Sequence, residues 1–272
     1  YANESFLTTC GPGATLQSPP KEPHLIEPWG HCPQLKRWAD KHGHVYHMPP
    51  ASIVRELMSK RFTFERGPRL PHSKLIRSTD DLQFDHYPVV IKSEFGFSGR
   101  GMRIYHRPVK PDSFIMGELN KGRVLIAEPW VERQLDFSSQ FLIDKEGIKY
   151  IGSSLIESDK KGRYQATITQ PDLTPWAKHF DACNQLLAEI QSMGYFGHIG
   201  VDAFMWEGQV HPIVEINPRK TMSYVAIQMA KGKKITMRWG PEGDITTNLL
   251  PSRLHCEEKE YIFPFRLNAQ EI

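Results

Sequence analysis

The sequence predicts an α/β (α+β) protein in which helices and strand hairpins share one chain. Three features lead to this prediction. Short apolar runs bounded by turn residues recur from residue 88 onward, which is typical of strands. Apolar side chains repeat at steps of three and four along 175–193, which is typical of an amphipathic helix. Two β-rich runs flank Glu207 and Gly208, so the stretch 197–217 predicts a hairpin.

The composition narrows the class of protein. The chain has 272 residues, a net charge of +3 and 39% apolar residues. This length suits one large or two small domains. The charge is too mild to indicate nucleic-acid binding, and no stripe of Lys and Arg with interleaved aromatics is present. The four cysteines are widely spaced, which favours reduced thiols in the cytoplasm, and no apolar run approaches the length of a membrane span.

The elements of the first half follow from caps, prolines and apolar runs. Ser52 follows two prolines and is a candidate cap for a helix over 53–60. The other predicted elements, in order, are a helix at 35–42, strands at 45–46, 88–92 and 102–105, a helix at 111–119 and a strand at 123–127.

The second half contains the strongest patterns. Its predicted strands are 137–143, 148–156 and 163–168, followed by the helix 175–193, the hairpin and a helix at 222–231. Thr174 caps the helix 175–193 and Gly194 ends it. The buried stripe of that helix is Trp176, Phe180, Cys183, Leu187 and Ile190. The residues after Gly232 carry no pattern that predicts an element.

The hairpin carries the most informative group of polar residues. A two-residue turn at 207–208 places Asp202 opposite Ile213. Side chains alternate between the two faces of a strand, so Glu215 and Asn217 share the face of Asp202. Glu215 is then a diagonal neighbour of Asp202, at about 7–8 Å.

This group has the chemistry of a magnesium site. Mg²⁺ prefers oxygen ligands and is commonly shared between carboxylates and substrate phosphates. Arg219, two residues after Asn217, adds a fork that suits a phosphate. The alternative is a hairpin with acidic residues on its solvent face. The matched parity of Asp202, Glu215 and Asn217 favours a site for magnesium–nucleotide chemistry.

A glycine-rich loop follows the strand that ends in Lys92. Its small residues are Gly96, Ser98, Gly99 and Gly101. Their spacing fits neither the dinucleotide fingerprint nor the Walker A motif. Either the loop is a plain connection beside an exposed lysine, or its backbone N–H groups and Lys92 hold phosphates. The acidic hairpin downstream favours the phosphate-binding interpretation.

A third feature is the polar linker after the apolar strand 123–127. Its start, Glu128–Val131, exposes backbone groups that suit an adenine edge, with Trp130 and Val131 as apolar walls. Glu132 and Asp136 are alternative acceptors for ribose hydroxyls. Taken alone, the segment is equally an ordinary strand-to-strand loop.

These three features, in this order, resemble the ATP-grasp superfamily, of the carboxylate-amine ligase type. The resemblance covers about 59–230, and Ile213–Arg219 is its most specific part. It implies two α+β subdomains that clasp ATP, preceded by a small α/β domain. The implied boundaries are 1–58 for the N-terminal domain, 59–127 for the lid subdomain, 128–231 for the subdomain with the magnesium site, and 232–272 for a C-terminal extension.

The resemblance also implies roles for individual residues. Asp202, Glu215 and Asn217 are the implied ligands of Mg²⁺ or Mn²⁺, and Arg219 and Lys92 the implied catalytic residues. The implied ATP-binding residues are Lys60, Lys92, Gly96, Ser98, Gly99, Gly101, Glu128, Trp130, Val131 and Asp136. Gly200 departs from members that have an arginine two residues before the acidic ligand.

The implied activity is ATP-dependent ligation. A carboxylate is activated as an acyl phosphate and joined to an amine or similar nucleophile, with release of ADP and phosphate. The substrates are expected to be small molecules, amino acids among them, and a homodimer is a family-level expectation. The alternatives are a small-molecule kinase on the same scaffold and a non-catalytic ATP-binding sensor.

Overall fold

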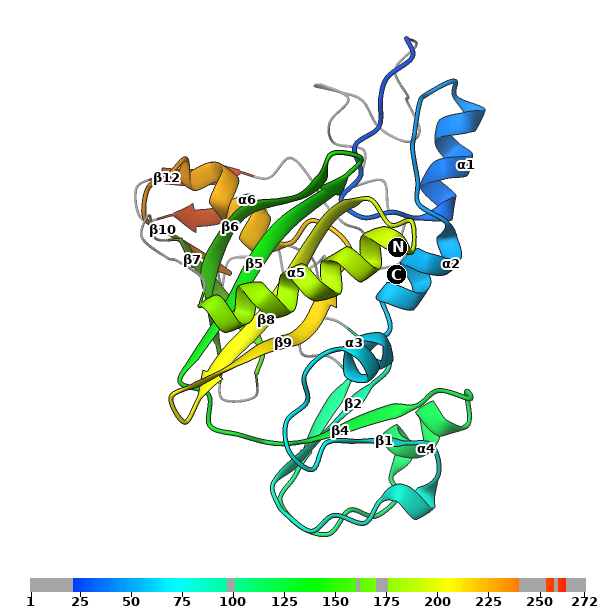
Figure 1. Ribbon diagram of the computed structural model, residues 1–272, viewed down its shortest axis with the longest axis vertical. Coiled ribbons are helices and arrows are strands. Elements are labelled where there is room, and N and C mark those ends of the chain that lie inside the picture. Colours follow the sequence, from blue (N-terminus) through cyan, green and yellow to red (C-terminus); the bar gives the residue numbers. More distant parts are fainter. Residues whose placement is uncertain are drawn as a thin grey trace.

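The computed structural model describes residues 22–96, 101–159, 162–169, 176–239, 253–256 and 259–262. Two antiparallel sheets organise these residues, one above the other in Figure 1. The predicted α/β (α+β) class is confirmed. Among the helices of the described ranges, none combines the length and the apolar character needed to cross a membrane.

The smaller sheet has four strands in the order β1-β4-β2-β3. Their bounds are Lys74–Ile76 for β1, Val89–Ser93 for β2, Met102–Tyr105 for β3 and Leu125–Pro129 for β4. Helix α4 (Ser113–Leu119) begins at Asp112, whose carboxylate accepts from the backbone N–H of Phe114 and of Ile115. Ile115 and Ile91 belong to the apolar core between α4 and the sheet. Side chains alternate along β2, so Lys92 lies on the opposite face from Ile91.

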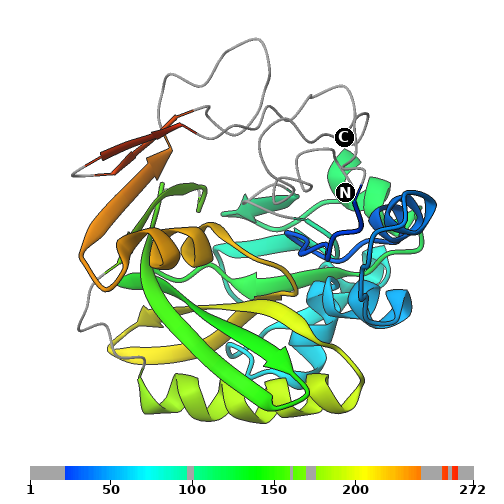
Figure 2. The ribbon, with the colours of Figure 1, turned by 90° about the horizontal axis from the view of Figure 1, so that it is seen from above.

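The larger sheet has eight strands in the order β12-β11-β10-β7-β6-β5-β8-β9. The bounds are Leu135–Asp144 (β5), Gly147–Ser158 (β6), Tyr164–Thr169 (β7), Gly197–Trp206 (β8), Gln209–Asn217 (β9), Ile235–Trp239 (β10), Arg253–Cys256 (β11) and Lys259–Ile262 (β12). Helices α5 (Ala177–Ser192) and α6 (Met222–Ala230) lie on opposite faces of it, as Figure 2 shows.

Helix α5 supplies much of the main core. Cys183, Leu187 and Ile190 of the predicted stripe are fully buried, and Phe180 packs against the same cluster. Trp176, just before the helix, packs against Phe137 of β5 in a tilted arrangement, with 4.6 Å between the ring centroids. The predicted cap Thr174 lies outside the described residues.

Three short helices precede the smaller sheet, and here two predictions are wrong. The chain forms α1 (Pro33–Lys41), α2 (Ala51–Leu57) and α3 (Lys60–Arg66). Ser52 does not cap a helix over 53–60, because α2 already begins after Pro50. Ser59 accepts from the backbone N–H of Arg61 and so starts a separate helix, α3. The expected strand at 45–46 is a single bridge between Leu25 and Val45.

Strand β10 was not anticipated from the sequence. It pairs with β7, and its Ile235 and Met237 are buried with Ala226 and Ala230 of α6. The segment is therefore ordered by α6 and β7 rather than by a strong pattern of its own.

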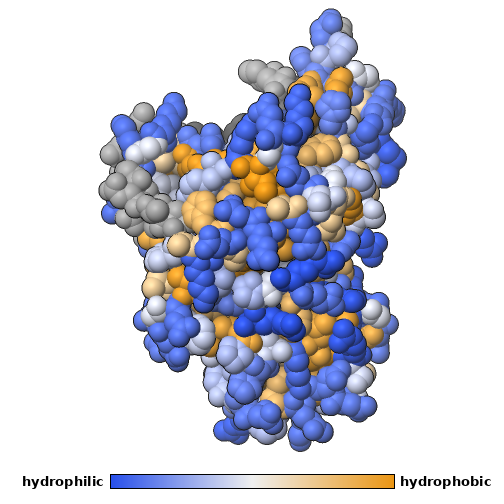
Figure 3. All heavy atoms as spheres, in the orientation of Figure 1, coloured by the Kyte–Doolittle hydropathy of each residue, from blue (hydrophilic) through white to orange (hydrophobic). Residues whose placement is uncertain are grey.

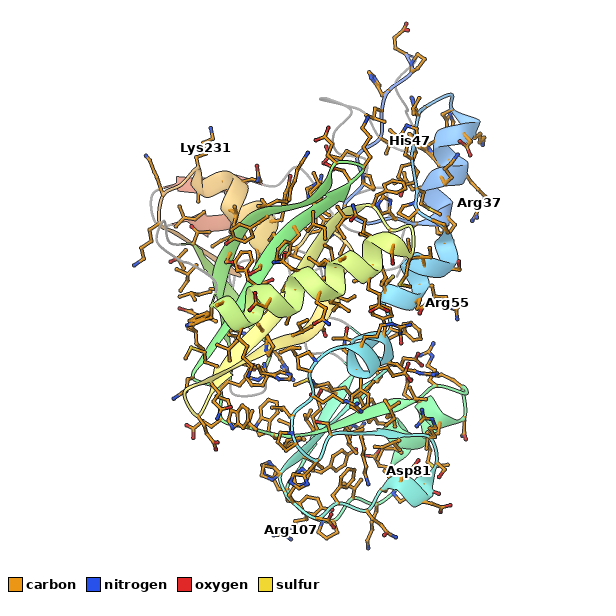
Figure 4. The ribbon with its side chains drawn as sticks, viewed as in Figure 1. Arg37, His47, Arg55, Asp81, Arg107 and Lys231 are labelled. Carbon is orange, nitrogen blue, oxygen red and sulfur yellow. The ribbon has the colours of Figure 1, made fainter. Side chains whose placement is uncertain are left out.

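Polar side chains cover most of the face that carries α5, and apolar groups on it are scattered (Figure 3). The basic side chains labelled in Figure 4, Arg37, Arg55, Arg107 and Lys231, lie at separate places on the outline of the molecule. A local concentration of charge is found instead where α3, β2 and the β8–β9 hairpin meet.

Candidate active site

The β8–β9 hairpin brings the predicted acidic residues together by an irregular register. Phe204 pairs with His211, but the next pair places Asp202 opposite Glu215. The expected pairing of Asp202 with Ile213 is wrong, because β9 contains a bulge of two extra residues at Pro212, which has no N–H for the ladder. Two residues are one full period of a strand, so the predicted face of Glu215 and Asn217 is retained.

Asp202 is held by a chain of hydrogen bonds. Ser138 Oγ donates to Asp202 Oδ1 at 2.6 Å, and Asn217 Nδ2 donates to Asp202 Oδ2 at 3.0 Å. Gln140 Nε2 donates to Ser138 Oγ at 2.8 Å, and Gln140 Oε1 accepts from Thr221 Oγ1 at 2.9 Å. Strand β5 and the start of α6 thus orient a carboxylate that the sequence pattern located on β8.

Gly200 is explained by close packing on the same face. A Cβ at this position would lie 2.8 Å from Thr221 Cγ2 and 3.1 Å from both terminal atoms of the Gln140 amide. A side chain here would push Thr221 away from Gln140, the residue that donates to Ser138. The glycine at position 200 is therefore tied to this network.

The two paired carboxylates differ in their affinity for protons. Burial raises the pKa of Asp202 to about 6, and the neighbouring charge of Glu215 adds to the rise. Burial also opposes ionisation of Glu215, but the ammonium of Lys60 holds the pKa of Glu215 below its usual range. Two carboxylates forced together need a positive charge between or beside them.

Two lysines now supply that charge. Lys60 Nζ lies 2.8 Å from Glu215 Oε2 and donates to the carbonyl of Gly96 at 2.8 Å. Lys92 Nζ donates to Glu128, its diagonal neighbour across β2 and β4. Burial works against ionisation of Glu128, and the charge of Lys92 keeps the pKa of Glu128 lowered. The predicted phosphate-binding lysines and two predicted acidic residues are thus paired with one another.

Arg219 lies two residues beyond the end of β9 and is partly buried. One of its terminal nitrogens donates to Asn217 Oδ1 at 2.8 Å, and the other donates to the Lys220 carbonyl at 3.2 Å. Burial lowers the pKa of Arg219, while the charges of Glu215 and Asp202 oppose the shift. Its backbone forms a bridge with Gly30, so a segment from the N-terminal part closes this end of the site.

The expected adenine-binding segment lies beside an aromatic face. The Trp130 N–H donates to the Pro88 carbonyl at 2.9 Å. The Arg133 guanidinium lies 4.5 Å from the Phe204 ring centre and 5.8 Å from that of Trp130. Asp136 accepts from Arg133 at 2.9 Å, so Arg133 is the present partner of one candidate ribose acceptor. Val131, which follows Trp130 in the chain, is partly buried.

A pocket lies between α3, the smaller sheet and β9. Its lining residues are Lys60, Thr63, Phe64, Pro68, Arg69, Lys92, Ile126, Glu128, His211, Ile213 and Val214. Burial lowers the pKa of His211 to about 4, so this ring is neutral at physiological pH. The pocket therefore lies between both lysines and the part of β9 that precedes Glu215.

The glycine-rich loop is described only at its ends. Ser98 and Gly99 lie outside the described residues. Gly101 has φ 76°, and a Cβ there would lie 2.4 Å from Ser93 Oγ, so this position requires glycine. The Gly96 carbonyl contacts Lys60, which ties the start of the loop to the site.

Sequence reasoning missed Ser138, Gln140, Phe204 and His211. Phe204 had a usable signal, because it is two residues from Asp202 and therefore shares its face. Ser138 and Gln140 belong to β5, and nothing in the sequence pattern indicated that β5 lies beside β8.

The donor set fits a small hard cation. Two carboxylates and an amide face one patch, and in the described part of the chain no group of three or more His, Cys, Asp or Glu residues offers a competing metal site. Mg²⁺ is commonly held by one or two carboxylates together with substrate phosphates, which the nearby lysines and Arg219 suit.

A family model described as the ATP-grasp domain matches residues 61–223. The chain belongs to the ATP-grasp family. No match was found among the curated proteins compared with the chain.

Solved structures resemble this ATP-grasp chain in fold. Pyruvate carboxylase from Rhizobium etli has a TM-score of 0.57 at 21% identity, covering 76% of this chain and 20% of that one. The biotin carboxylase domain of 2-oxoglutarate carboxylase from Hydrogenobacter thermophilus, a dimer with MgADP, ADP and bicarbonate, has a TM-score of 0.53 at 18% identity. The match covers 72% of this chain and 47% of that one. N5-carboxyaminoimidazole synthetase from Staphylococcus aureus, complexed with ADP, has a TM-score of 0.52 at 16% identity. The match covers 78% of this chain and 63% of that one. The chain thus spans less than two thirds of each of these structures.

Proposed function

We propose that this ATP-grasp protein is an ATP-dependent ligase that joins a carboxylate to an amine or a similar nucleophile. The observation that carries the proposal is the direct pairing of Asp202 with Glu215, surrounded by Lys60, Lys92 and Arg219. Such a site neutralises the phosphates of a nucleotide and the charge that develops during phosphoryl transfer. ADP in two of the similar structures, with magnesium and bicarbonate in one, is consistent with it.

The proposed reaction has two steps. An oxygen of the substrate carboxylate forms a bond to the γ-phosphorus of ATP, and the bond to the β,γ-bridging oxygen breaks, so that ADP leaves. The amine then attacks the carbonyl carbon of the acyl phosphate. The bond between that carbon and the phosphate oxygen breaks, inorganic phosphate leaves, and the amine loses a proton.

The chain's own residues have distinct parts in this proposal. Lys60 and Lys92 bind phosphate oxygens, exchanging their present carboxylate partners for the nucleotide. Asp202, Glu215 and Asn217 hold the divalent cation, Mg²⁺ or Mn²⁺. That cation neutralises phosphate charge when bound. Arg219, fixed by Asn217, stabilises the transferred phosphoryl group as a charged fork.

The adenine is proposed to lie against the segment from Glu128 to Val131. Trp130 and Phe204 offer apolar faces there, with Arg133 and Asp136 near the ribose. Gly96, Ser98, Gly99 and Gly101 are proposed to cover the phosphates. The proposed division of the chain keeps the lid subdomain at 59–127 and the metal-binding subdomain at 128–231.

The substrates are proposed to be a small carboxylic acid and a small amine, with amino acids as the first candidates to test. We further propose that the reaction takes place in the cytoplasm, because Cys32 and Cys183 are buried free thiols.

Trapping with hydroxylamine tests this function. The protein is incubated with Mg-ATP, hydroxylamine and pools of carboxylic acids, and ADP and hydroxamate are measured. Acid-dependent formation of both supports the ligase. ADP release with a stable phosphate ester and no hydroxamate would instead indicate a kinase, and nucleotide binding without ADP release under any pool would indicate a sensor.

A further inference from the structure

The bulge in β9 is the feature that sets the register of the acidic pair. Phe204 and His211 pair normally, and Pro212 follows. Proline gives the ladder no N–H, so β8 cannot hold this point of β9 through a regular pair of hydrogen bonds. Another group must therefore fix the position of Pro212.

That group is His179 of α5, on the face of the larger sheet that α5 covers. Its Nδ1 lies 2.6 Å from the Pro212 carbonyl, and its Nε2 lies 2.8 Å from Ser139 Oγ. The His179 residue is fully buried, in the first turn of α5. A carbonyl can only accept, so Nδ1 carries the hydrogen and the neutral ring accepts at Nε2. Burial lowers the pKa of His179, which keeps the ring in this neutral form.

The direction of the remaining bonds follows from that assignment. Ser139 donates to His179 and accepts from Ser153 at 2.6 Å. Ser153 in turn accepts from the Tyr150 hydroxyl at 2.9 Å. A single directed chain therefore runs from Tyr150, at the surface, to the carbonyl of the bulge.

Strand β5, which carries Ser139, also holds Asp202 of the acidic pair, through a residue on its opposite face. Ser138 and Ser139 are neighbours on β5, so they point to opposite faces. Ser138 donates to Asp202, whereas Ser139 orients His179. Asp202 and the bulge that positions Glu215 are thus fixed against adjacent residues of one strand.

The Ser139–His179 pair is not a nucleophile with its base. Both residues are fully buried, and His179 already uses both ring nitrogens. Cys183, one helical turn further on, has its thiol 3.5 Å from Nε2, but burial raises its pKa to about 12, so it stays protonated. Ser139, His179 and Cys183 therefore position other groups and take no part in a chemical step.

We propose that His179 is a positioning residue for the cation site, which it serves by locking Pro212 so that Glu215 lies opposite Asp202. This inference rests on the proposed function, because it takes Asp202 and Glu215 as the cation ligands. Without the bond to Pro212, the buried carbonyl loses its partner, and the hairpin is free to move toward the regular register, in which Ile213 faces Asp202.

Two matched polar variants separate the two bonds of the ring. In His179→Asn the amide nitrogen takes the place of Nδ1 and keeps the bond to Pro212. In His179→Gln the longer amide takes the place of Nε2, so it keeps a partner for Ser139 and loses Pro212. Tyr150→Phe is the control, because it removes only the far end of the chain.

The affinity for Mn²⁺ is measured from the free-ion EPR signal at saturating ADP, and ADP binding is measured separately with EDTA. We expect His179→Gln to weaken Mn²⁺ binding by about tenfold or more, as loss of a group that orients ligands does, whereas His179→Asn and Tyr150→Phe stay within about threefold of the original protein. ADP binding without metal should be unchanged in all three.

Hydrogen exchange of the metal-free proteins gives an independent reading of the bulge. Faster exchange over 209–217 in His179→Gln, but not in His179→Asn, is expected. Equal Mn²⁺ affinity in the Gln and Asn variants would overturn the positioning role. If the original protein itself bound no Mn²⁺ with ADP, the proposed function would fail and the role in cation binding with it, while the exchange comparison would still report whether His179 holds the bulge.

Discussion

At the scale of single residues, the site is a set of opposite charges that are paired with one another. Lys60 contacts Glu215, and Lys92 contacts Glu128. Each pair is largely withdrawn from water, so removal of one partner leaves a poorly compensated charge. ATP and a divalent cation would replace both partners at once, which keeps the charge balanced.

Loss of the cation ligands should remove turnover without unfolding the protein. We expect Glu215→Gln and Asn217→Ala each to lower ADP release by at least about 100-fold, equivalent to about 2.7 kcal/mol. Glu207→Gln, in the exposed turn of the same hairpin, is the matched control and should keep its activity. Steady-state ADP release together with circular dichroism checks this, and full activity in either ligand variant would contradict the metal assignment.

The Lys60–Glu215 pair predicts that metal and nucleotide affect each other's binding. Because the Lys60 ammonium competes with a cation for Glu215, Lys60→Gln should bind Mn²⁺ alone about three- to tenfold more tightly, a coupling of about 1 kcal/mol. The same variant should bind ADP more weakly. Lys36→Gln, which removes an exposed pair with Asp40, serves as the control in titration calorimetry. Unchanged Mn²⁺ affinity in Lys60→Gln would show that the pair does not compete with metal.

At the scale of elements, strands β5, β8 and β9 and helix α6 meet at Gly200. We expect Gly200→Ala to destabilise the fold by about 1–3 kcal/mol, because the new methyl group would lie 2.8 Å from Thr221 Cγ2. Thr221→Ser removes that methyl and keeps the hydroxyl that bonds Gln140 and caps α6. The double variant should therefore recover part of the loss in urea unfolding, and additive losses would disprove the steric cause.

The β8–β9 hairpin shows which features of the site could be predicted from the sequence and which could not. The shared face of Asp202, Glu215 and Asn217 was predictable, because strand periodicity is a local property of the backbone. Their direct pairing was not, because it depends on a bulge at Pro212 and on His179 from a separate helix. Likewise, the split between α2 and α3 depends on the local cap at Ser59, which a pattern of apolar residues does not reveal.

At the scale of the whole molecule, the N-terminal segment is joined to the large sheet. The ring nitrogens of His31 lie 3.0 Å from the Tyr46 hydroxyl and 3.0 Å from the Phe196 carbonyl. Lys220, next to Arg219, pairs with Glu27 at 2.6 Å. These contacts close one end of the site with residues that lie outside the ATP-grasp match at 61–223. Sequence patterns could not indicate them, since each joins positions far apart in the chain.

This junction predicts a loss of stability in acid. Burial lowers the pKa of His31 to about 4, whereas in the unfolded chain it stays near 6.5. Between these values the unfolded state binds more protons, so stability is fully present above about pH 6.5 and falls as the pH drops toward 4. Replacement by His31→Gln should reduce this dependence by about 1–2 kcal/mol. Urea unfolding at pH 7.5 and pH 5 measures it, and an identical pH dependence in the variant would refute the assignment.

In the proposed reaction, a carboxylate oxygen of the substrate attacks the γ-phosphorus of ATP. The most direct measurement uses an acid found by hydroxylamine trapping, labelled with ¹⁸O in its carboxylate, and follows the label into inorganic phosphate by mass spectrometry. We expect one ¹⁸O atom in each phosphate released, because that oxygen bridges carbon and phosphorus in the acyl phosphate. Phosphate without label, at the same rate of ADP release, would contradict it.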